Sequence, residues 1–341
     1  MPALAAAASA IALALPAGSP HRPVTPAASA DPQAQALYLQ DRYLWNRRTP
    51  VSLEAAASAF GAAIARDPRY AAAYAGLADT WLLMREFGTM PDAQAFLRAS
   101  AAADAALAID PGLAAAARAR VFVRFWWNED HAGGLAAFRA AIALAPGDAQ
   151  THHWYASALT ALGDQPQALA EIETARRLDP VSPAILTDRG LIFFQAGRMA
   201  EAQAALAELL ANEPNLPAAH AYLARVLLAR GDAAGFLREA LADARLRRDP
   251  VAEAIYAPGV DELATVDRAA MLAAVAARAE RAFNQGRFGT FGVARLEAIA
   301  GHDARARVLA KVAMDRHEVG AFDAPTDHWL SAAGVGRAPE K

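Results

Sequence analysis

The sequence predicts an all-α fold, an α-solenoid of stacked helical hairpins, and three observations lead to that prediction. Apolar residues, mostly alanine, make up 55% of the 341 residues, and alanine is the strongest helix former. Prolines that follow Asp, Glu or Ala recur at spacings of 43, 35, 34, 34 and 36 residues, at Pro68, Pro111, Pro146, Pro180, Pro214 and Pro250. Glycine hinges recur 34 residues apart, at Gly163, Gly197 and Gly231. Such a period is typical of hairpins that bury their apolar faces by stacking on one another.

The clearest hairpin follows Asp148. Its apolar pattern predicts helices over about 149–162 and 166–178. Asp148 stands where an N-cap would accept free N–H groups, and Gly163 suits the left-handed residue that closes the first helix. Asp164 can cap the second helix in the same way. We therefore predict a helix–turn–helix unit here.

Earlier in the chain, the same signals predict two further helix pairs. Thr49-Pro50 marks the start of a helix that ends near Pro68. The next pair contains an insertion around Glu86 to Gln94, which suggests either a functional loop or a surface extension, and we favour the extension.

After the array the period decays. Residues 244–262 are predicted to form a linker, because they contain Pro250 and Pro258. Asp267 is predicted to cap a long helix, and a last hairpin is expected at about 290–300 and 304–316. The chain thus divides into residues 1–30 as an apolar leader, 31–250 as an array of about six repeats, 251–330 as a degenerate C-terminal helical cap, and 331–341 as a flexible tail.

The leader has an apolar run over residues 4–15, followed by a stretch rich in Pro and Ala. The run is too short for a full membrane span and fits the core of a signal peptide better. Three alternatives stay open: a weak export signal processed near Ala28-Ser29-Ala30, the second half of a longer membrane tether, and a low-complexity leader without a targeting role.

From Ala36 to Pro250 the chain resembles the tetratricopeptide repeat family. The residues at signature positions are His152, Tyr155, Ala156, Leu159, Ala168, Ile172, Ala175 and Pro180 in one repeat, and Leu186, Gly190, Phe193, Ala202, Leu206 and Pro214 in the next. Arg189 and Leu209 stand where the family usually has Leu and Ala. The resemblance implies a right-handed superhelix of antiparallel helix pairs.

Aromatic residues are dense in the third repeat, at Phe122, Phe125, Trp126 and Trp127. They suggest either a ligand pocket or a bulky interface between repeats that compensates for small alanines, and we favour the interface.

No catalytic or cofactor-binding signature is present, so we expect neither an enzyme nor a cofactor or metal site. The sequence has no phosphate-binding loop, no nucleophile elbow and no cysteine. The formal net charge of −3 does not favour nucleic acid. His152 and His220 occupy equivalent repeat positions, which indicates packing roles, and Glu171 and Glu173 are expected on a solvated helix face.

The resemblance also implies that a partner binds the concave face, which the first helix of each repeat lines. The candidate residues that it carries over are Asp79, Leu82, Gln150, His153, Ser157, Thr160, Thr187, Leu191, Phe194, Arg225 and Leu228. No lysine or asparagine stands among them, so binding to acidic chaperone tails is not expected. Such a groove suits an apolar segment, or one that arginine recognises, in a protein or peptide partner of open identity.

Three functional hypotheses follow. The leading one is a non-enzymatic scaffold for protein or peptide binding in the bacterial cell envelope, either periplasmic or anchored to the inner membrane, with a cytoplasmic location as the alternative. The segments LYLQDRYLWNRRTP and ARDPRYAAAYAGLADTW resemble repeat arrays of membrane-anchored winged-helix transcriptional regulators of the cadaverine-operon type. The second hypothesis is therefore the sensory portion of such a regulator, and the third is an enzyme of unrecognised class. The oligomeric state stays open.

Overall fold

The computed structural model describes residues 29–46, 49–87, 90–262, 266–316, 318, 321 and 324–336. These residues form seventeen α-helices and no strand, so the all-α prediction is confirmed. The helices are α1 (Pro32–Asn46), α2 (Pro50–Arg66), α3 (Ala71–Phe87), α4 (Asp92–Ile109), α5 (Ala114–Trp126), α6 (His131–Leu144), α7 (Ala149–Ala161), α8 (Gln165–Leu178), α9 (Pro183–Gln195), α10 (Met199–Asn212), α11 (Pro217–Ala229), α12 (Ala233–Arg247), α13 (Pro250–Glu262), α14 (Arg268–Asn284), α15 (Thr290–Ile299), α16 (Asp303–Asp315) and α17 (His328–Ala332).

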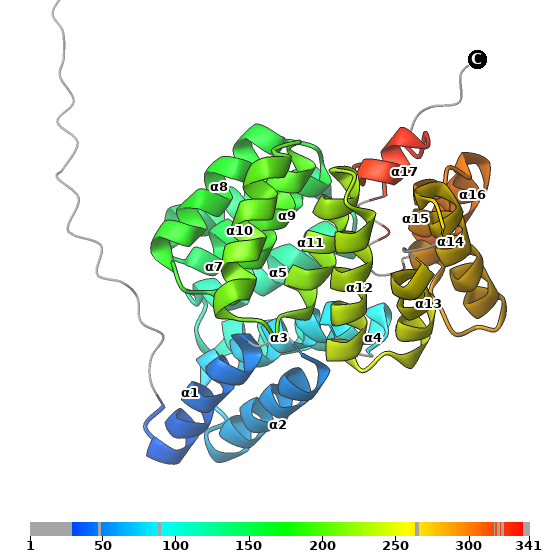
Figure 1. The fold of residues 1–341 in the computed structure, drawn as a ribbon. Helices are drawn as coiled ribbons and strands as arrows, with labels where there is room; N and C mark the ends of the chain where they lie inside the picture. Colours follow the sequence, from blue (N-terminus) through cyan, green and yellow to red (C-terminus); the bar gives the residue numbers. More distant parts are fainter. Residues whose placement is uncertain are drawn as a thin grey trace, which may run out of the picture.

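The helices pack as consecutive antiparallel pairs that stack into a curved array (Figure 1). From α1 to α11, the odd-numbered helix of each pair also packs on the odd-numbered helix of the next pair. The odd-numbered helices therefore form the inner layer of the solenoid, and the even-numbered helices cover them from outside. We call the surface of α3, α5, α7, α9 and α11 that points away from the even-numbered helices the inner face.

The predicted hairpin after Asp148 is formed by α7 and α8. Gly163 adopts a left-handed conformation with φ of +81°, and the next amide, of Asp164, donates to the carbonyl of Leu159 at 2.9 Å. The Asp164 side chain accepts from the amide of Gln167 and caps α8 as expected. Gly197 and Gly231 have φ of +74° and +92°. A left-handed glycine that closes a helix therefore recurs every 34 residues.

The glycine at position 190, one of the tetratricopeptide signature positions, is explained by the close approach of α9 and α10. Gly190 of α9 is buried against Leu206 of α10, and a β-carbon at this position would overlap the Leu206 side chain. Small residues here let the two helices of a pair come close enough for large residues to interdigitate.

Two predicted connections are in fact largely helical. Most of the Glu86–Gln94 insertion lengthens helices, since α3 extends to Phe87 and α4 begins at Asp92. The prediction of a linker over residues 244–262 is wrong, because α12 continues to Arg247 and α13 occupies Pro250–Glu262. Proline is harmless in a first helical turn.

Proline also stands inside α13, at Pro258. Here the helix packs between α12 and α14, and the Arg278 guanidinium donates to the carbonyl of Ile255 at 2.8 Å. A proline inside a helix removes one backbone hydrogen bond, and packing against α12 and α14 offsets that loss here.

The C-terminal helices pack on the array through a continuous apolar core. This core extends from Leu228 of α11 through Met271 of α14 to Leu330 of α17. Residues 331–336, predicted as part of the flexible tail, are packed, with Ala333 and Val335 buried. The leader up to residue 28 and the tail from residue 337 lie outside the described residues.

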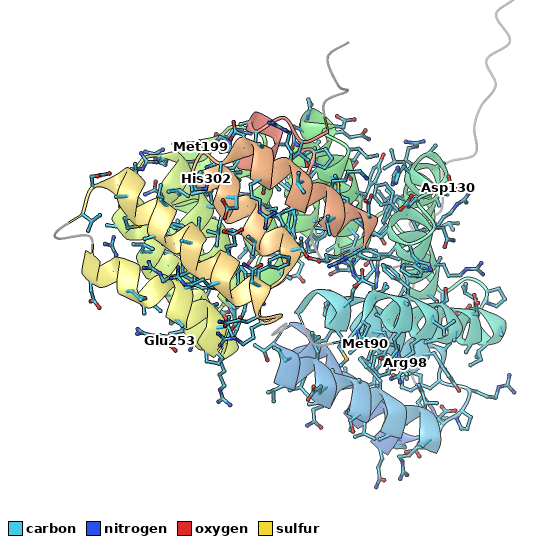
Figure 2. All side chains as sticks on the ribbon, turned by 90° about the vertical axis from the view of Figure 1, so that its right-hand side faces the viewer. Met90, Arg98, Asp130, Met199, Glu253 and His302 are labelled. Atoms are coloured by element: carbon cyan, nitrogen blue, oxygen red, sulfur yellow. The ribbon has the colours of Figure 1, made fainter. Side chains whose placement is uncertain are left out.

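At the other end, Met90 packs against a small cluster formed by Leu53, Leu83 and Met84, between the first two helix pairs (Figure 2). Ala218 of α11 packs against the same cluster. The array is therefore curved strongly enough for its sixth helix pair to return to the second. None of the helices in the described ranges has the length and apolar character needed to cross a membrane.

Candidate functional site

The predicted site residues lie together on the inner helices α3, α7, α9 and α11. Most of their side chains, however, are buried within the protein. Seven of the eleven predicted residues are buried, namely Asp79, Leu82, His153, Thr160, Thr187, Phe194 and Leu228. The four that stay partly accessible are Gln150, Ser157, Leu191 and Arg225. The inner face therefore offers a narrower surface than the sequence predicts.

Asp79 belongs to a buried ion cluster centred on Arg118 of α5. The Arg118 guanidinium donates to Asp79 of α3 and to Asp148 before α7, each at 2.5 Å, and it lies 5.2 Å from the centre of the Trp154 ring. Arg118 and Asp79 are each 5% exposed, so these two charges are removed from water and depend on one another. Arg118 thus links three repeats through Asp79 and Asp148.

Asp148 stands at the N-cap of α7, as the sequence predicts, but its side chain does not cap the helix. Its carboxylate accepts from Arg118 and from the Thr151 hydroxyl, and α7 has no side-chain cap. Arg118 lies 30 residues earlier in the chain, and a charged donor forms a stronger hydrogen bond with a carboxylate than a backbone N–H does.

Polar residues of α7 are held within the repeat stack. The fully buried ring of His153 bonds through Nε2 to Asp188 of α9 at 2.5 Å, and through Nδ1 to Gln150 at 3.2 Å. The hydroxyls of Ser157 and Thr160 donate to carbonyls one turn earlier, at 3.2 and 2.8 Å. His153 therefore joins two neighbouring repeats, whereas Ser157 and Thr160 bond to backbone carbonyls of their own helix.

The chain itself covers the inner face at α9 and α11. Asp327, which is fully buried at the start of α17, forms ion pairs with Arg225 at 3.2 Å and with Arg295 of α15 at 2.9 Å. The Phe194 ring centre lies 5.4 Å from that of His328 and 5.8 Å from that of Trp329. Figure 1 shows α17 between the array and the pair α15 and α16.

The electrostatics of Asp327 follow from this position. Burial opposes its charge, but Arg295, Arg225 and the amides of Leu330 and Trp329 outweigh burial and hold the pKa of the carboxyl below its ordinary value of 3.8. The Arg225 guanidinium is also stacked 5.4 Å from the Phe194 ring centre and 5.8 Å from that of Tyr222.

His152 and His220 occupy matching environments, as their equivalent positions predict. Each ring bonds through Nδ1 to a glutamate carboxylate, that of Glu171 or Glu239, at 2.6 Å, and the carboxylate is the acceptor. Each Nε2 lies at 3.1 or 2.9 Å from the carbonyl of a repeat-closing proline. The sequence predicts Glu171 on a solvated helix face, and the structure shows that its carboxylate also bonds to the His152 ring.

Both flanking groups of each histidine are acceptors, and only an imidazolium can donate from both ring nitrogens. Burial opposes the positive charge, but the glutamate and the carbonyl outweigh it and raise the pKa of His152 and of His220 above 6.5.

The aromatic residues of the third repeat form part of the packing between repeats. Phe122 and Phe125 are buried, and the Phe122 ring centre lies 4.8 Å from that of Trp154 in the next repeat. Trp127 is 40% exposed and stacks on Phe96 at 5.1 Å. The contacts correspond to the favoured hypothesis of a bulky repeat interface.

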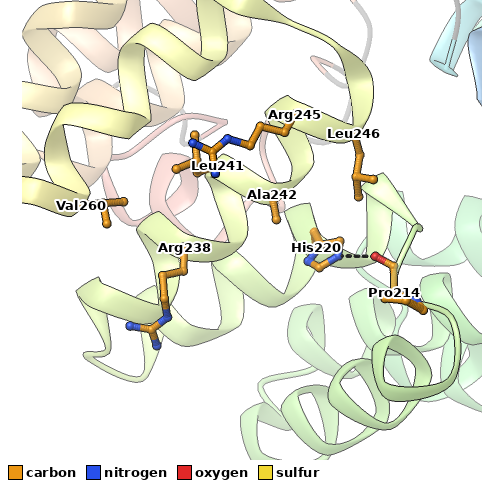
Figure 3. A pocket seen from close by; sticks show the side chains of 8 residues that line it. All are labelled: Pro214, His220, Arg238, Leu241, Ala242, Arg245, Leu246 and Val260. Carbon is orange, nitrogen blue, oxygen red and sulfur yellow. Dashed lines mark hydrogen bonds between the residues drawn. The ribbon is translucent and has the colours of Figure 1, made fainter.

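A cavity of about 480 Å³ opens elsewhere, between α11, α12 and α13 (Figure 3). It is lined by Pro214, His220, Arg238, Leu241, Ala242, Arg245, Leu246 and Val260. His220 bonds to Pro214 and Glu239, and Arg245 pairs with Glu253 at 2.9 Å. Within the described ranges, no group of three or more His, Cys, Asp or Glu side chains is arranged to hold a metal ion.

Sequence reasoning missed the C-terminal half of this site. It identified Phe194 and Arg225 but not Asp327, Trp329 or Arg295. The only available signal was the single Asp-His-Trp sequence before Leu330, which nothing in the repeat period connects to α11.

Comparison with known proteins supports the repeat assignment. The tetratricopeptide repeat family model matches residues 123–183, 156–202 and 187–253. The fold is similar to that of yeast Tom70, with a TM-score of 0.50, 13% identity, and coverage of 92% of this chain and 66% of Tom70. It is also similar to the human IFIT1 dimer with m7Gppp-AAAA, with a TM-score of 0.52, 15% identity, and coverage of 83% and 67%.

These likenesses describe the fold. The chain spans just under two thirds of the Tom70 structure that it matches, and no curated protein sequence matches it. Together, the hinges and the paired helices show an all-α solenoid fold of the tetratricopeptide-repeat type, and the family match identifies such repeats within residues 123–253.

Proposed function

We propose that this chain is a non-enzymatic scaffold that binds a segment of a partner protein along its inner face. The observation that carries the proposal is the row of partly accessible side chains Gln150, Ser157, Leu191 and Arg225, presented by three successive inner helices. Amide, hydroxyl, aliphatic and guanidinium groups in a row suit an extended or helical peptide of mixed polarity.

The fold alone does not select the class of ligand, since the IFIT1 structure holds m7Gppp-AAAA. The charges of this chain favour a protein partner. Its formal net charge is −3, and the arginines of the inner region are already paired, with Arg118 bound to Asp79 and Arg225 bound to Asp327. Phosphate backbones require clusters of positive charge.

Capture of partners from a native extract tests this proposal. Leu191→Glu introduces a charge into the row, so it should abolish capture of proteins that bind the unmodified chain. Val181→Glu is the matched control, because Val181 is 79% exposed in the turn before α9. Equal capture by both variants would rule out the inner face as the binding surface.

The proposal extends to a cell-envelope location, supported by the apolar run over residues 4–15 of the sequence. The alternative of a sensory array in a membrane-anchored regulator is supported by the resemblance of residues 37–50 and 65–81 to such arrays. The intact mass and N-terminal sequence of the natively expressed protein separate the alternatives. A start between about Ala17 and Asp31 supports export, and a longer polypeptide supports the regulator.

A further inference from the structure

Residues 327–329 of the chain itself contact the inner face at Arg225 and Phe194. Asp327 supplies a carboxylate to Arg225, and His328 and Trp329 supply rings to Phe194. The same segment starts a short helix, since Oδ1 of Asp327 accepts from the amides of Trp329 and Leu330 at 3.1 and 3.2 Å.

The two sides of this segment face different parts of the molecule. Asp327, His328 and Trp329 touch the array at Arg225 and Phe194. Leu330, Ala333 and Val335 are buried in the apolar core that joins α11 and α12 to the C-terminal helices, and Trp329 also packs against that core. A competitor for Arg225 and Phe194 therefore has to replace one ion pair and two ring contacts, and it does not contact Leu330, Ala333 or Val335.

Asp327 also forms two ion pairs, with Arg295 and with Arg225. Its pair with Arg295 is the shorter, at 2.9 Å, and its pair with Arg225 is the longer, at 3.2 Å. If another carboxylate takes Arg225, Asp327 keeps Arg295 and both amide hydrogen bonds. The exchange therefore leaves no buried charge unpaired, which is the condition that usually makes breaking such a pair costly.

We propose that the partner segment carries a carboxylate two residues before a tryptophan or another aromatic residue, at the start of a helical turn, and competes with residues 327–329 for Arg225 and Phe194. The inference rests on the proposed function and specifies the partner. An acidic and aromatic segment complements a guanidinium that lies near two aromatic rings, 5.4 Å from the centre of Phe194 and 5.8 Å from that of Tyr222.

Titration with a synthetic peptide tests the inference on the full chain. The probe is a fluorescent peptide with the sequence of residues 325–332, PTDHWLSA, and its two controls have Asn for the Asp or Ala for the Trp. The chain variant is Asp327→Asn, which keeps a capping oxygen but removes the charge that holds Arg225. Asp315→Asn is the matched control, because Asp315 lies in an exposed pair with Lys311.

Asp327→Asn should bind the probe at least tenfold more tightly than the unmodified chain or Asp315→Asn. Each control peptide should bind at least tenfold more weakly than the probe, and adding Arg225→Ala should remove the gain. If Asp327→Asn loses helical content, Trp329→Ala replaces it, since it removes a ring from Phe194 and keeps the carboxylate.

A folded variant that binds the probe no better than the unmodified chain would overturn the inference, as would a gain that survives Arg225→Ala. Failure here is distinguishable from failure of the proposed function. Loss of partner capture in Leu191→Glu would still support the inner face as a binding surface, for a segment of other chemistry.

Discussion

Arg225 of α11 and Asp327, which lies 102 residues later, form an ion pair of 3.2 Å across the inner face. Arg225 lies on the inner face, which we propose as the binding surface, and Asp327 belongs to the segment that joins the array to α15 through Arg295. The pair therefore links a candidate binding residue to the packing of the C-terminal helices.

Asp327→Asn should lower the free energy of unfolding by about 3 to 5 kcal/mol, because it leaves two guanidinium groups without their shared carboxylate. Chemical denaturation followed by circular dichroism checks the value. Asp315→Asn should change it by less than about 1 kcal/mol, since its pair with Lys311 is exposed. Equal changes in the free energy of unfolding would show that the buried pair stabilises the fold no more than the exposed pair does.

The same carboxylate predicts an acid dependence. Because the folded-state pKa of Asp327 lies below 3.8, its contribution to stability is present above that value and is lost as the pH falls through the folded-state pKa. Denaturation midpoints measured between pH 5 and pH 2 should therefore fall less steeply in Asp327→Asn than in the unmodified chain. Parallel curves would contradict this assignment.

His152 and His220 predict the opposite dependence at higher pH. Their folded-state pKa values lie above 6.5, so their contribution is full below 6.5 and is lost as the pH rises through the folded-state values. The double variant His152→Gln and His220→Gln should flatten the decline in denaturation midpoint over this range. Glu171→Gln should flatten it in part, because the amide still accepts from Nδ1 but carries no charge. An unchanged slope in both variants would show that the histidines are not charged in these sites.

Arg118 and Arg120 offer a direct test of the buried ion cluster. Arg118→Met should lower the free energy of unfolding by about 3 to 5 kcal/mol, since it removes the guanidinium that the buried Asp79 and the partly buried Asp148 share. Arg120→Met breaks an exposed pair with Asp104 and should cost less than about 1 kcal/mol. Thermal denaturation of the two variants gives the comparison, and similar shifts would contradict the role of the cluster.

Two glycines in helices should respond in opposite directions to alanine. Gly190→Ala should destabilise the chain by about 1 to 3 kcal/mol, because the added methyl group overlaps Leu206. Gly61→Ala, where no atom lies within 4 Å of the new β-carbon, should stabilise α2 by about 0.5 to 1 kcal/mol. Denaturation midpoints measure both, and a stabilising Gly190→Ala would show that the helices of this pair can separate at no cost.

The features that the sequence predicts well are local ones. The hinge at Gly163 and the caps at Asp164 and Asp267 depend on residues within one helical turn, and repetition every 34 residues makes each signal reinforce the next. The helix α13 was missed because two prolines suggest a break, and only packing against α12 and α14 outweighs that local preference.

The site was predictable only in part for the same reason. The repeat register places Phe194 and Arg225 on the inner face, but their partner Asp327 is connected to them by no periodicity. Asp148 shows the same limit, since its capping role is replaced by an ion pair with a residue 30 positions away. Long-range charge pairs determine the surroundings of Asp79, His153 and Arg225, and the repeat register does not predict these pairs.

Site-specific photo-crosslinking in cells tests the central claim, that the inner face binds a partner protein, most directly. A photoreactive amino acid is placed at Gln150, Ser157 or Leu191 on the inner face, and at Val181 outside it. The account predicts the same discrete adduct from the three inner positions and none from position 181. Adducts from position 181 alone, or none from any inner position, would contradict it.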